Sequence, residues 1–115
     1  MTNPTDIVLH QKSKVLEIAF DDGSRFNLPF EFLRVHSPSA EVQGHGPGQE
    51  TLQFGKKDVN ITSVEPVGSY ALQITFDDGH DSGLYSWETL HRFGKNQDDM
   101  WQEYLAQLKA AGKSR

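Results

Sequence analysis

The sequence predicts an α+β fold: two β-hairpin-plus-short-helix units in a small, mostly antiparallel β assembly, followed by a C-terminal α-helix. Three observations predict it. Apolar side chains alternate and end in the same Asp-Asp-Gly turn at 16–23 and at 72–79, which is typical of strands that bury one face. Each hairpin is followed by a residue that suits a helix start, Pro29 or Ser86. Apolar side chains recur at helical spacing over 101–108.

The first unit is expected to hold an apolar run at 7–9, strands at 15–20 and 25–28, a turn at 21–23 and a helix at 29–34. Leu16, Ile18 and Phe20 share one face of the central strand. Gly23 suits the turn because it accepts a positive φ. Pro29 suits the first helical turn, where its missing N–H would have no partner anyway.

The second unit is expected to hold strands at 59–65, 70–76 and 80–85, turns at 66–69 and 77–79, and a helix at 87–93. Ser86 is its expected N-cap and Gly94 its expected C-terminal cap. The segment from residue 16 to 23 matches that from 72 to 79, an offset of 56. Because the match continues into the helix, the sequence favours an internal duplication over two unrelated hairpins.

A last helix is predicted over 96–111, with Asn96 as its cap and Gly112 at its end. Its apolar stripe follows the i, i+3, i+4, i+7 pattern and comprises Trp101, Tyr104, Leu105 and Leu108. The simplest interpretation is core packing. The alternative is a dimer or partner surface, because Trp and Tyr are enriched at such surfaces.

Composition narrows the function classes. The 115 residues fit one domain, 1–115, and the absence of cysteine excludes disulfides, thiolate catalysis and Cys-ligated metals within the chain. A net charge of −5 without a Lys/Arg block argues against nucleic acid or anionic lipid as partners. No apolar run approaches the roughly 20 residues of a membrane helix. The expectation is a cytoplasmic protein.

The connection from 35 to 58 is the most informative segment. It exceeds the roughly 12–15 residues beyond which structureless loops become uncommon. A part of it at 51–54 is expected to be extended. Loops on rigid scaffolds commonly carry binding, so we expect a partner-binding surface here. Its candidate residues are Arg34, His36, Ser37, Ser39, Glu41 and His45.

Histidines offer a competing interpretation. His36, His45 and His80 would form a metal site if the connection folded back onto the second hairpin, with Glu41 or Asp81 completing the ligand shell. Imidazole suits zinc, nickel, copper and iron. The spacing matches no fixed metal signature, so capping or hydrogen-bonding roles compete with this one.

Catalytic motifs are not found. The glycine-rich run at 44–48 lacks the Lys-Ser/Thr of a P-loop, and no Gly-x-Ser-x-Gly occurs. The paired aspartates at 21–22 and 77–78 lie in predicted turns, where Asp is expected for turn geometry. We therefore expect the chain not to be an enzyme by itself.

Two motifs carry a family resemblance: Ser-Pro-Ser-Ala-Glu-Val-Gln-Gly-His-Gly at 37–46 and Asp-Gly-His-Asp-Ser-Gly-Leu-Tyr-Ser-Trp at 78–87. With them, nearly the whole chain resembles stand-alone bacterial members of the γ-butyrobetaine hydroxylase N-terminal-like domain family. In large oxygenases of that family, this domain precedes an iron/2-oxoglutarate catalytic domain and holds zinc through three Cys and one His. The corresponding positions here are at or near Ser37, Ser39 and Val42, and at His80. Only the His is kept.

The resemblance also implies an accessory role near iron–sulfur assembly, since the domain occurs fused to P-loop iron–sulfur carriers. The functional hypothesis is therefore a non-catalytic accessory or protein-interaction domain, linked to iron–sulfur or oxygenase systems, that docks on a protein or self-associates. It needs no cofactor. The alternative is a zinc- or iron-binding accessory domain in iron–sulfur cluster assembly, with His36, His45 and His80 as ligands.

Overall fold

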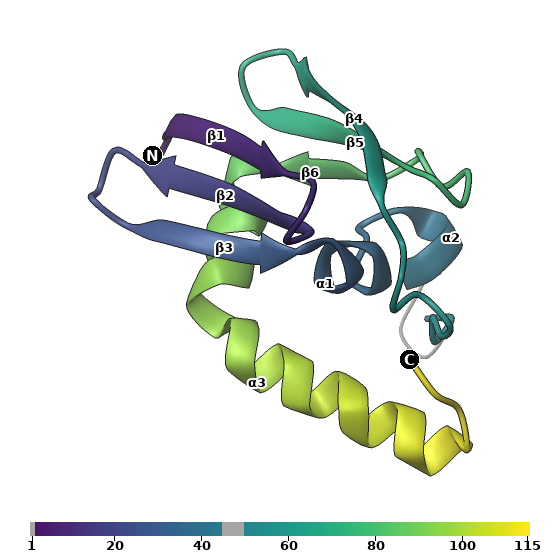
Figure 1. Ribbon diagram of the computed structural model, residues 1–115. Helices are drawn as coiled ribbons and strands as arrows, with labels where there is room; N and C mark the ends of the chain where they lie inside the picture. Colours follow the sequence, from purple (N-terminus) through teal and green to yellow (C-terminus); the bar gives the residue numbers. More distant parts are fainter. Residues whose placement is uncertain (1, 45–49) are drawn as a thin grey trace.

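The computed structural model describes residues 2–44 and 50–115 and confirms the α+β prediction. Two three-stranded sheets lie above a short helix, and a long helix runs beneath them (Figure 1). In chain order the elements are β1 (Pro4–His10), β2 (Val15–Phe20), β3 (Arg25–Pro29), α1 (Phe30–Val35), α2 (Ala40–Gln43), β4 (Ile61–Val67), β5 (Ala71–Phe76), β6 (Leu84–Ser86) and α3 (Trp87–Ala111). None of the described helices is both long and apolar enough to cross a membrane.

The two sheets repeat one hydrogen-bonding plan. Their strand orders are β1-β2-β3 and β4-β5-β6, and every pairing is antiparallel. In the first sheet the Asp21 N–H donates to Asn3 O at 2.9 Å, and the Asn3 N–H donates to Asp21 Oδ1 at 3.2 Å. Asp77 and Asn60 exchange the same two bonds at 2.9 and 3.0 Å. The internal duplication predicted from the sequence is therefore also seen in the strand order and hydrogen bonds of the two sheets.

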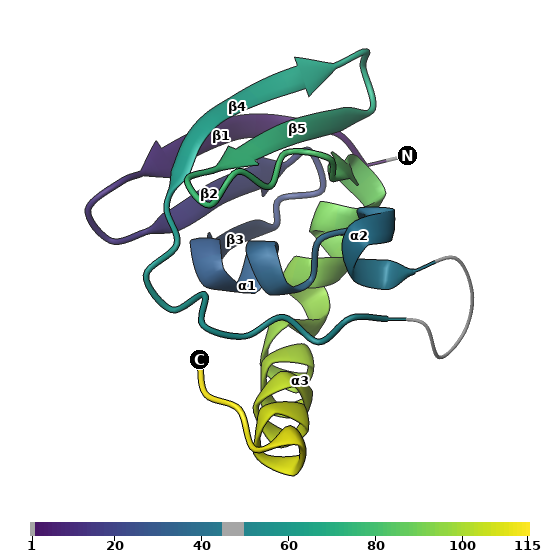
Figure 2. The same cartoon turned by 90° about the vertical axis from the view of Figure 1, so that its right-hand side faces the viewer.

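One core joins both units. Its fully buried side chains come from both sheets, α1 and the first part of α3, and include Leu16, Ile18, Leu28, Phe32, Leu33, Leu72, Ile74, Tyr85 and Leu90. Burial of such side chains contributes about 1.5–3 kcal/mol each. In Figure 2 the hairpins of the two units lie side by side above α1, and the second half of α3 extends below it.

The long helix α3 corrects one predicted boundary, at Gly94, and keeps the other, at Asn96, as a kink. Ser86 caps it as expected, accepting from the Thr89 N–H at 3.1 Å, and Gly112 ends it with φ +68. However, the helix does not stop at Gly94. A Cβ there would lie 2.2 Å from Cγ of Phe26, so glycine permits close packing on β3. Asn96 has non-helical φ −115 and ψ 15, and it forms a kink at which two helical segments meet within α3, so the predicted boundary at Asn96 is present as a kink.

Other boundaries also differ from the sequence prediction. Pro66 was expected in a turn but lies in β4, which is an edge strand and tolerates the missing N–H. The return strand is reduced to β6, because residues 80–83 leave the sheet. Residues 51–54, which were expected to be extended, have no regular secondary structure. The four-residue helix α2 was not predicted; Ser39 caps it by accepting from the Glu41 N–H at 3.2 Å.

Candidate functional site

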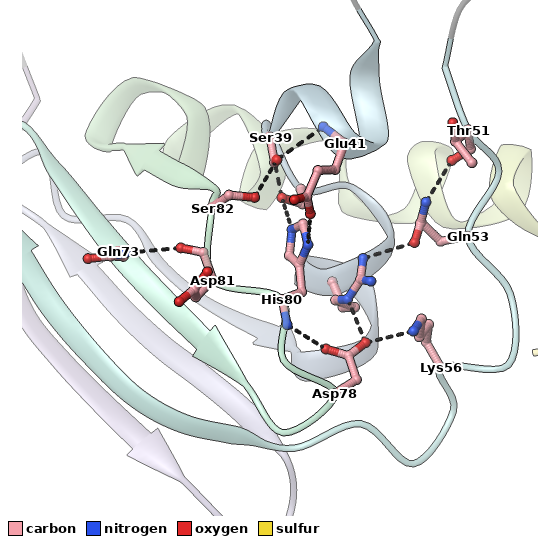
Figure 3. A network of polar contacts seen from close by, with 12 residues as sticks. Ser39, Glu41, Thr51, Gln53, Lys56, Gln73, Asp78, His80, Asp81 and Ser82 are labelled. Carbon is pink, nitrogen blue, oxygen red and sulfur yellow. Dashed lines mark hydrogen bonds and ion pairs between the residues drawn. The ribbon is translucent and has the colours of Figure 1, made fainter.

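The candidate site is centred on His80, whose side chain is only 4% exposed. Its Nε2 lies 2.8 Å from Ser37 Oγ. Its Nδ1 lies 3.0 Å from Glu41 Oε2 (Figure 3). Ser37 follows α1, Glu41 lies in the first turn of α2, and His80 follows the turn after β5. The fold thus assembles a serine, a histidine and a carboxylate from segments about 40 residues apart.

The hairpin turn positions His80. The His80 N–H donates to Asp78 Oδ1 at 3.1 Å. In the first unit the Ser24 N–H makes the same bond to Asp22 Oδ1 at 2.9 Å. His80 therefore occupies the place that Ser24 holds in the other unit, and the same turn directs its side chain toward α1 and α2.

A second polar cluster adjoins this one around Asp78 (Figure 3). Asp78 Oδ2 accepts from Arg34 Nε at 2.8 Å and from Lys56 Nζ at 2.6 Å. Arg34 is buried and also donates to Gln53 Oε1 at 3.0 Å. Burial raises the pKa of the Asp78 carboxyl, but the hydrogen bonds from Lys56, the His80 N–H and Arg34 outweigh it and lower that pKa to about 2.

The Ser37 hydroxyl is enclosed. Ser37 is 0% exposed, and its Oγ also accepts from the Ser39 N–H at 3.2 Å. Gly83 closes the remaining side, since a Cβ there would lie 2.5 Å from Ser37 Oγ. Nucleophilic attack requires the reacting atoms at about 3–3.5 Å, and the residues described by the structure leave this hydroxyl no surface that a substrate could reach. The serine–histidine–glutamate arrangement therefore ties the α1–α2 connection to the β5–β6 connection.

Burial and Arg34 lower the pKa of His80, while Glu41 and Asp78 oppose them. A neutral imidazole satisfies both contacts: Nδ1–H donates to the Glu41 carboxylate, and Nε2 accepts from the Ser37 hydroxyl. The Glu41 side chain is 69% exposed. The site therefore presents a carboxylate to solvent and keeps its histidine inside.

The residues at the zinc positions implied by the family resemblance do not fit that metal. Ser37 is bonded to His80, Ser39 Oγ lies 2.7 Å from Ser82 Oγ, and Val42 is a buried hydrocarbon with no donor atom. Zinc prefers thiolate, imidazole and carboxylate ligands. Over 2–44 and 50–115, no three His, Cys, Asp or Glu residues are grouped so that they could hold a metal ion.

The predicted site residues fall into different environments. Arg34, Ser37 and Ser39 are buried and bonded within the chain, whereas Glu41 is exposed. His36 is half-buried; its Nδ1 lies 2.9 Å from Phe32 O, and burial lowers its pKa. His45 lies outside the described residues. The structure thus brings together Ser37, Glu41 and His80, and partner contact by the predicted residues stays a prediction.

Sequence reasoning missed Asp78, Lys56 and Ser82. Asp78 was assigned to turn geometry alone, yet one carboxylate oxygen serves the turn and the other binds Arg34 and Lys56. The internal duplication was the one sequence signal that could have drawn attention to Asp78, because it pairs this residue with Asp22 of the first turn. Lys56 and Ser82 carried no signal in the sequence.

A groove of about 610 Å³ lies beside the site. It runs between the second half of α3 and residues 50–53. Its apolar lining includes Val35, Val42, Leu52, Met100 and Tyr104, and Glu50 and Glu103 add carboxylates. His36, Gln43 and Met100 also line a neighbouring cavity of about 540 Å³.

The fold and the site define a small α+β domain of two repeated three-stranded sheets, with a buried polar cluster between the units. The chain belongs to the gamma-butyrobetaine hydroxylase-like, N-terminal family, whose model matches residues 7–91. This confirms the resemblance found in the sequence.

Solved structures agree with this assignment. Two solution NMR structures are each 52% identical with a TM-score of 0.86; the matches cover all of this chain and 90% and 86% of those chains. A crystal structure of a protein of unknown function from Acidithiobacillus ferrooxidans, of the DUF971 family, is 37% identical with a TM-score of 0.68. That match covers 80% of this chain and 92% of the other. A search of curated proteins gave no match.

Proposed function

We propose that this chain is a non-catalytic accessory domain that binds a protein partner in the groove between α3 and residues 50–53. The groove is the observation that carries the proposal. Its volume of about 610 Å³ lies within the roughly 300–1,000 Å³ of sites that bury a ligand of drug size. A few side chains of a protein segment fill such a volume.

The floor of the groove is apolar and held in place. Val35 and Tyr104 are buried with Leu108 in a second small core cluster, against which Leu52 packs. The Tyr104 hydroxyl donates to Gln53 O at 2.7 Å, which ties α3 to the far wall of the groove. A preorganised floor lowers the cost of ordering on binding.

The negative charge at the groove indicates which kind of partner would fit it. Glu50 and Glu103 are exposed at the groove, and the chain carries a net charge of −5. Complementary potential steers encounter and fixes orientation. The occupant that fits is an amphipathic segment whose apolar side chains enter the groove while Lys or Arg faces the two glutamates. The family resemblance favours a partner from iron–sulfur or oxygenase systems.

The buried polar cluster supports a non-catalytic role. Within the described residues, Ser37, His80 and Glu41 make a serine–histidine–carboxylate arrangement, and its hydroxyl is sealed by Gly83. The arrangement holds α2 against the body of the fold, and α2 supplies Val42 to the groove. The cluster therefore shapes the binding surface.

Charge reversal at the groove tests the proposal. Glu103→Lys should lower recovery of the partner in a quantitative pull-down from the native cells by about three- to tenfold, since an unfavourable contact of roughly 1 kcal/mol is expected. Glu88→Lys is the matched control, because Glu88 is exposed on the same helix but does not line this groove. Equal recovery with both variants would remove the groove as the docking surface.

A further inference from the structure

The segment that follows α3 folds back onto the body of the domain. Gly112 reverses the chain with φ +68, and residues 113–115 run back toward α1 (Figure 2). The Lys113 N–H donates to Leu108 O at 2.9 Å, and the Gly55 N–H donates to Ser114 O at 3.1 Å. These contacts bring the side chain of Arg115 over the gap between α1 and α3.

Arg115 meets a carboxylate and an aromatic ring there. Its Nη2 donates to Glu31 Oε1 at 2.7 Å and its Nε donates to Glu31 Oε2 at 3.2 Å, a two-point contact. Its guanidinium carbon lies 5.2 Å from the centre of the Trp101 ring. A planar guanidinium matches both features at once, which the point charge of lysine does not.

Burial is unequal between the two sides of this contact. The Glu31 side chain is 8% exposed, whereas the Arg115 side chain is 46% exposed. Among the described residues, Arg115 is the donor to the Glu31 carboxylate. An ionised carboxylate so buried is stabilised by a paired cation, and the loss of that cation is costly. Glu31 and Trp101 thus belong to the helices α1 and α3, whereas Arg115 lies on the short segment that follows α3.

Apart from the contacts of Arg115, that segment has few attachments. Besides the two backbone bonds, Lys113 Nζ lies 4.8 Å from the ring of Phe54, which is 49% exposed. Surface segments with few buried contacts open at low free-energy cost. Glu31 and Trp101 therefore become accessible to a competing guanidinium whenever residues 113–115 detach.

We propose that Glu31 and Trp101 form an arginine-binding site, which Arg115 occupies within the chain and which an arginine of a protein partner occupies when it displaces the segment after α3. The chain's own arginine defines the chemistry of the ligand. Neither Glu31 nor Trp101 lines the groove of the proposed function. The two proposals therefore hold or fail separately.

NMR titration of the full chain tests this site. The probe is the hexapeptide Ala-Ala-Gly-Lys-Ser-Arg, the sequence of residues 110–115. In Arg115→Ala the peptide should shift the indole N–H of Trp101 saturably and leave that of Trp87 unmoved. The unaltered chain should need roughly tenfold more peptide, because the tethered arginine competes at high effective concentration.

Two controls sharpen the result. A peptide ending in lysine should bind Arg115→Ala at least about threefold more weakly, since it lacks the planar fork. Glu31→Gln in the same background should abolish binding; if that variant does not fold, Trp101→Leu, read at the Glu31 amide, should weaken it. Equal shifts with the two peptides, or equal binding to Arg115→Ala and the unaltered chain, would overturn the proposal.

Discussion

Arg34 of α1 binds Asp78 in the turn of the other unit, with Nε 2.8 Å from Oδ2. The duplication makes this contact half of a reciprocal pair. Asp22, at the corresponding place in the first turn, lies 2.9 Å from Nε2 of His91, which corresponds to Arg34. Each unit's helix therefore binds the turn of the other unit. The two contacts differ in depth: Arg34 is 8% exposed in its side chain, and His91 is 21% exposed.

This difference predicts unequal effects of one substitution. Asp78→Asn leaves the buried Arg34 without its charged partner and should lower the free energy of unfolding by about 3 kcal/mol. Asp22→Asn, the matched control, acts on a more exposed contact and should lower the free energy of unfolding by clearly less. Urea denaturation monitored by tryptophan fluorescence measures both. Equal losses would contradict the inference that the Arg34 contact holds the units together.

Removal of the Ser37 hydroxyl should destabilise the fold. Ser37→Ala leaves His80 Nε2 buried without its partner, which costs about 1–3 kcal/mol. Ser82→Ala removes a hydroxyl from the exposed edge of the same cluster and should cost under about 1 kcal/mol. Thermal unfolding compares them. A Ser37→Ala protein as stable as the unaltered chain would mean that this contact is not a structural tie.

Stability should fall as the pH drops below neutrality. Burial and Arg34 lower the pKa of His80 in the folded chain below the ordinary value of 6.5. Between that value and the folded one, the unfolded chain binds the extra proton, so acid favours unfolding. The stabilisation is present above pH 6.5 and is lost as the pH falls toward the folded pKa.

The slope of the unfolding midpoint against pH shows which histidine causes the loss of stability in acid. His80→Gln should flatten the dependence of the unfolding midpoint on pH between about 7 and 5. His10→Gln is the control, because it removes a side chain that is 41% exposed. His36, whose pKa burial also lowers, should contribute part of the remaining slope. An unchanged slope in His80→Gln would show that His80 does not titrate with unfolding in this range.

Metal analysis tests whether the residues at the zinc positions implied by the family resemblance can hold zinc. Protein purified without a histidine tag and dialysed with zinc should retain under about 0.1 equivalent, because hydroxyls and Val42 occupy the positions to which the family resemblance assigns thiolate ligands. Elemental analysis by mass spectrometry gives the stoichiometry. Zinc near one equivalent that is lost in His80→Ala would restore the metal-binding hypothesis.

Local patterns predicted much of the fold. Period-two alternation and the repeated Asp-Asp-Gly located both hairpins, because these features depend on neighbouring residues. Long-range contacts explain the failures. Gly94 was predicted to end a helix, but it leaves room for the ring of Phe26, which is 68 residues earlier in the chain. Asp78 looked like a turn residue, and its ion pair with Arg34 spans 44 residues.

The site was predicted in part for the same reason. The family resemblance placed His80 beside the connection that holds Ser37, and the structure joins them at 2.8 Å. Nothing local indicated that the serine would be sealed by Gly83. Nor did the sequence indicate the groove, since its walls come from α1, α2, α3 and residues 50–53.

Photo-crosslinking inside the native cells tests most directly that the groove is a docking surface. A benzophenone amino acid replaces Gln107, which lines the groove, or Gln102, an exposed glutamine of the same helix that does not. The proposal predicts a discrete adduct from position 107 that is absent from position 102 and is reduced by Glu103→Lys. Adducts of equal yield from both positions, or none from position 107, would contradict it.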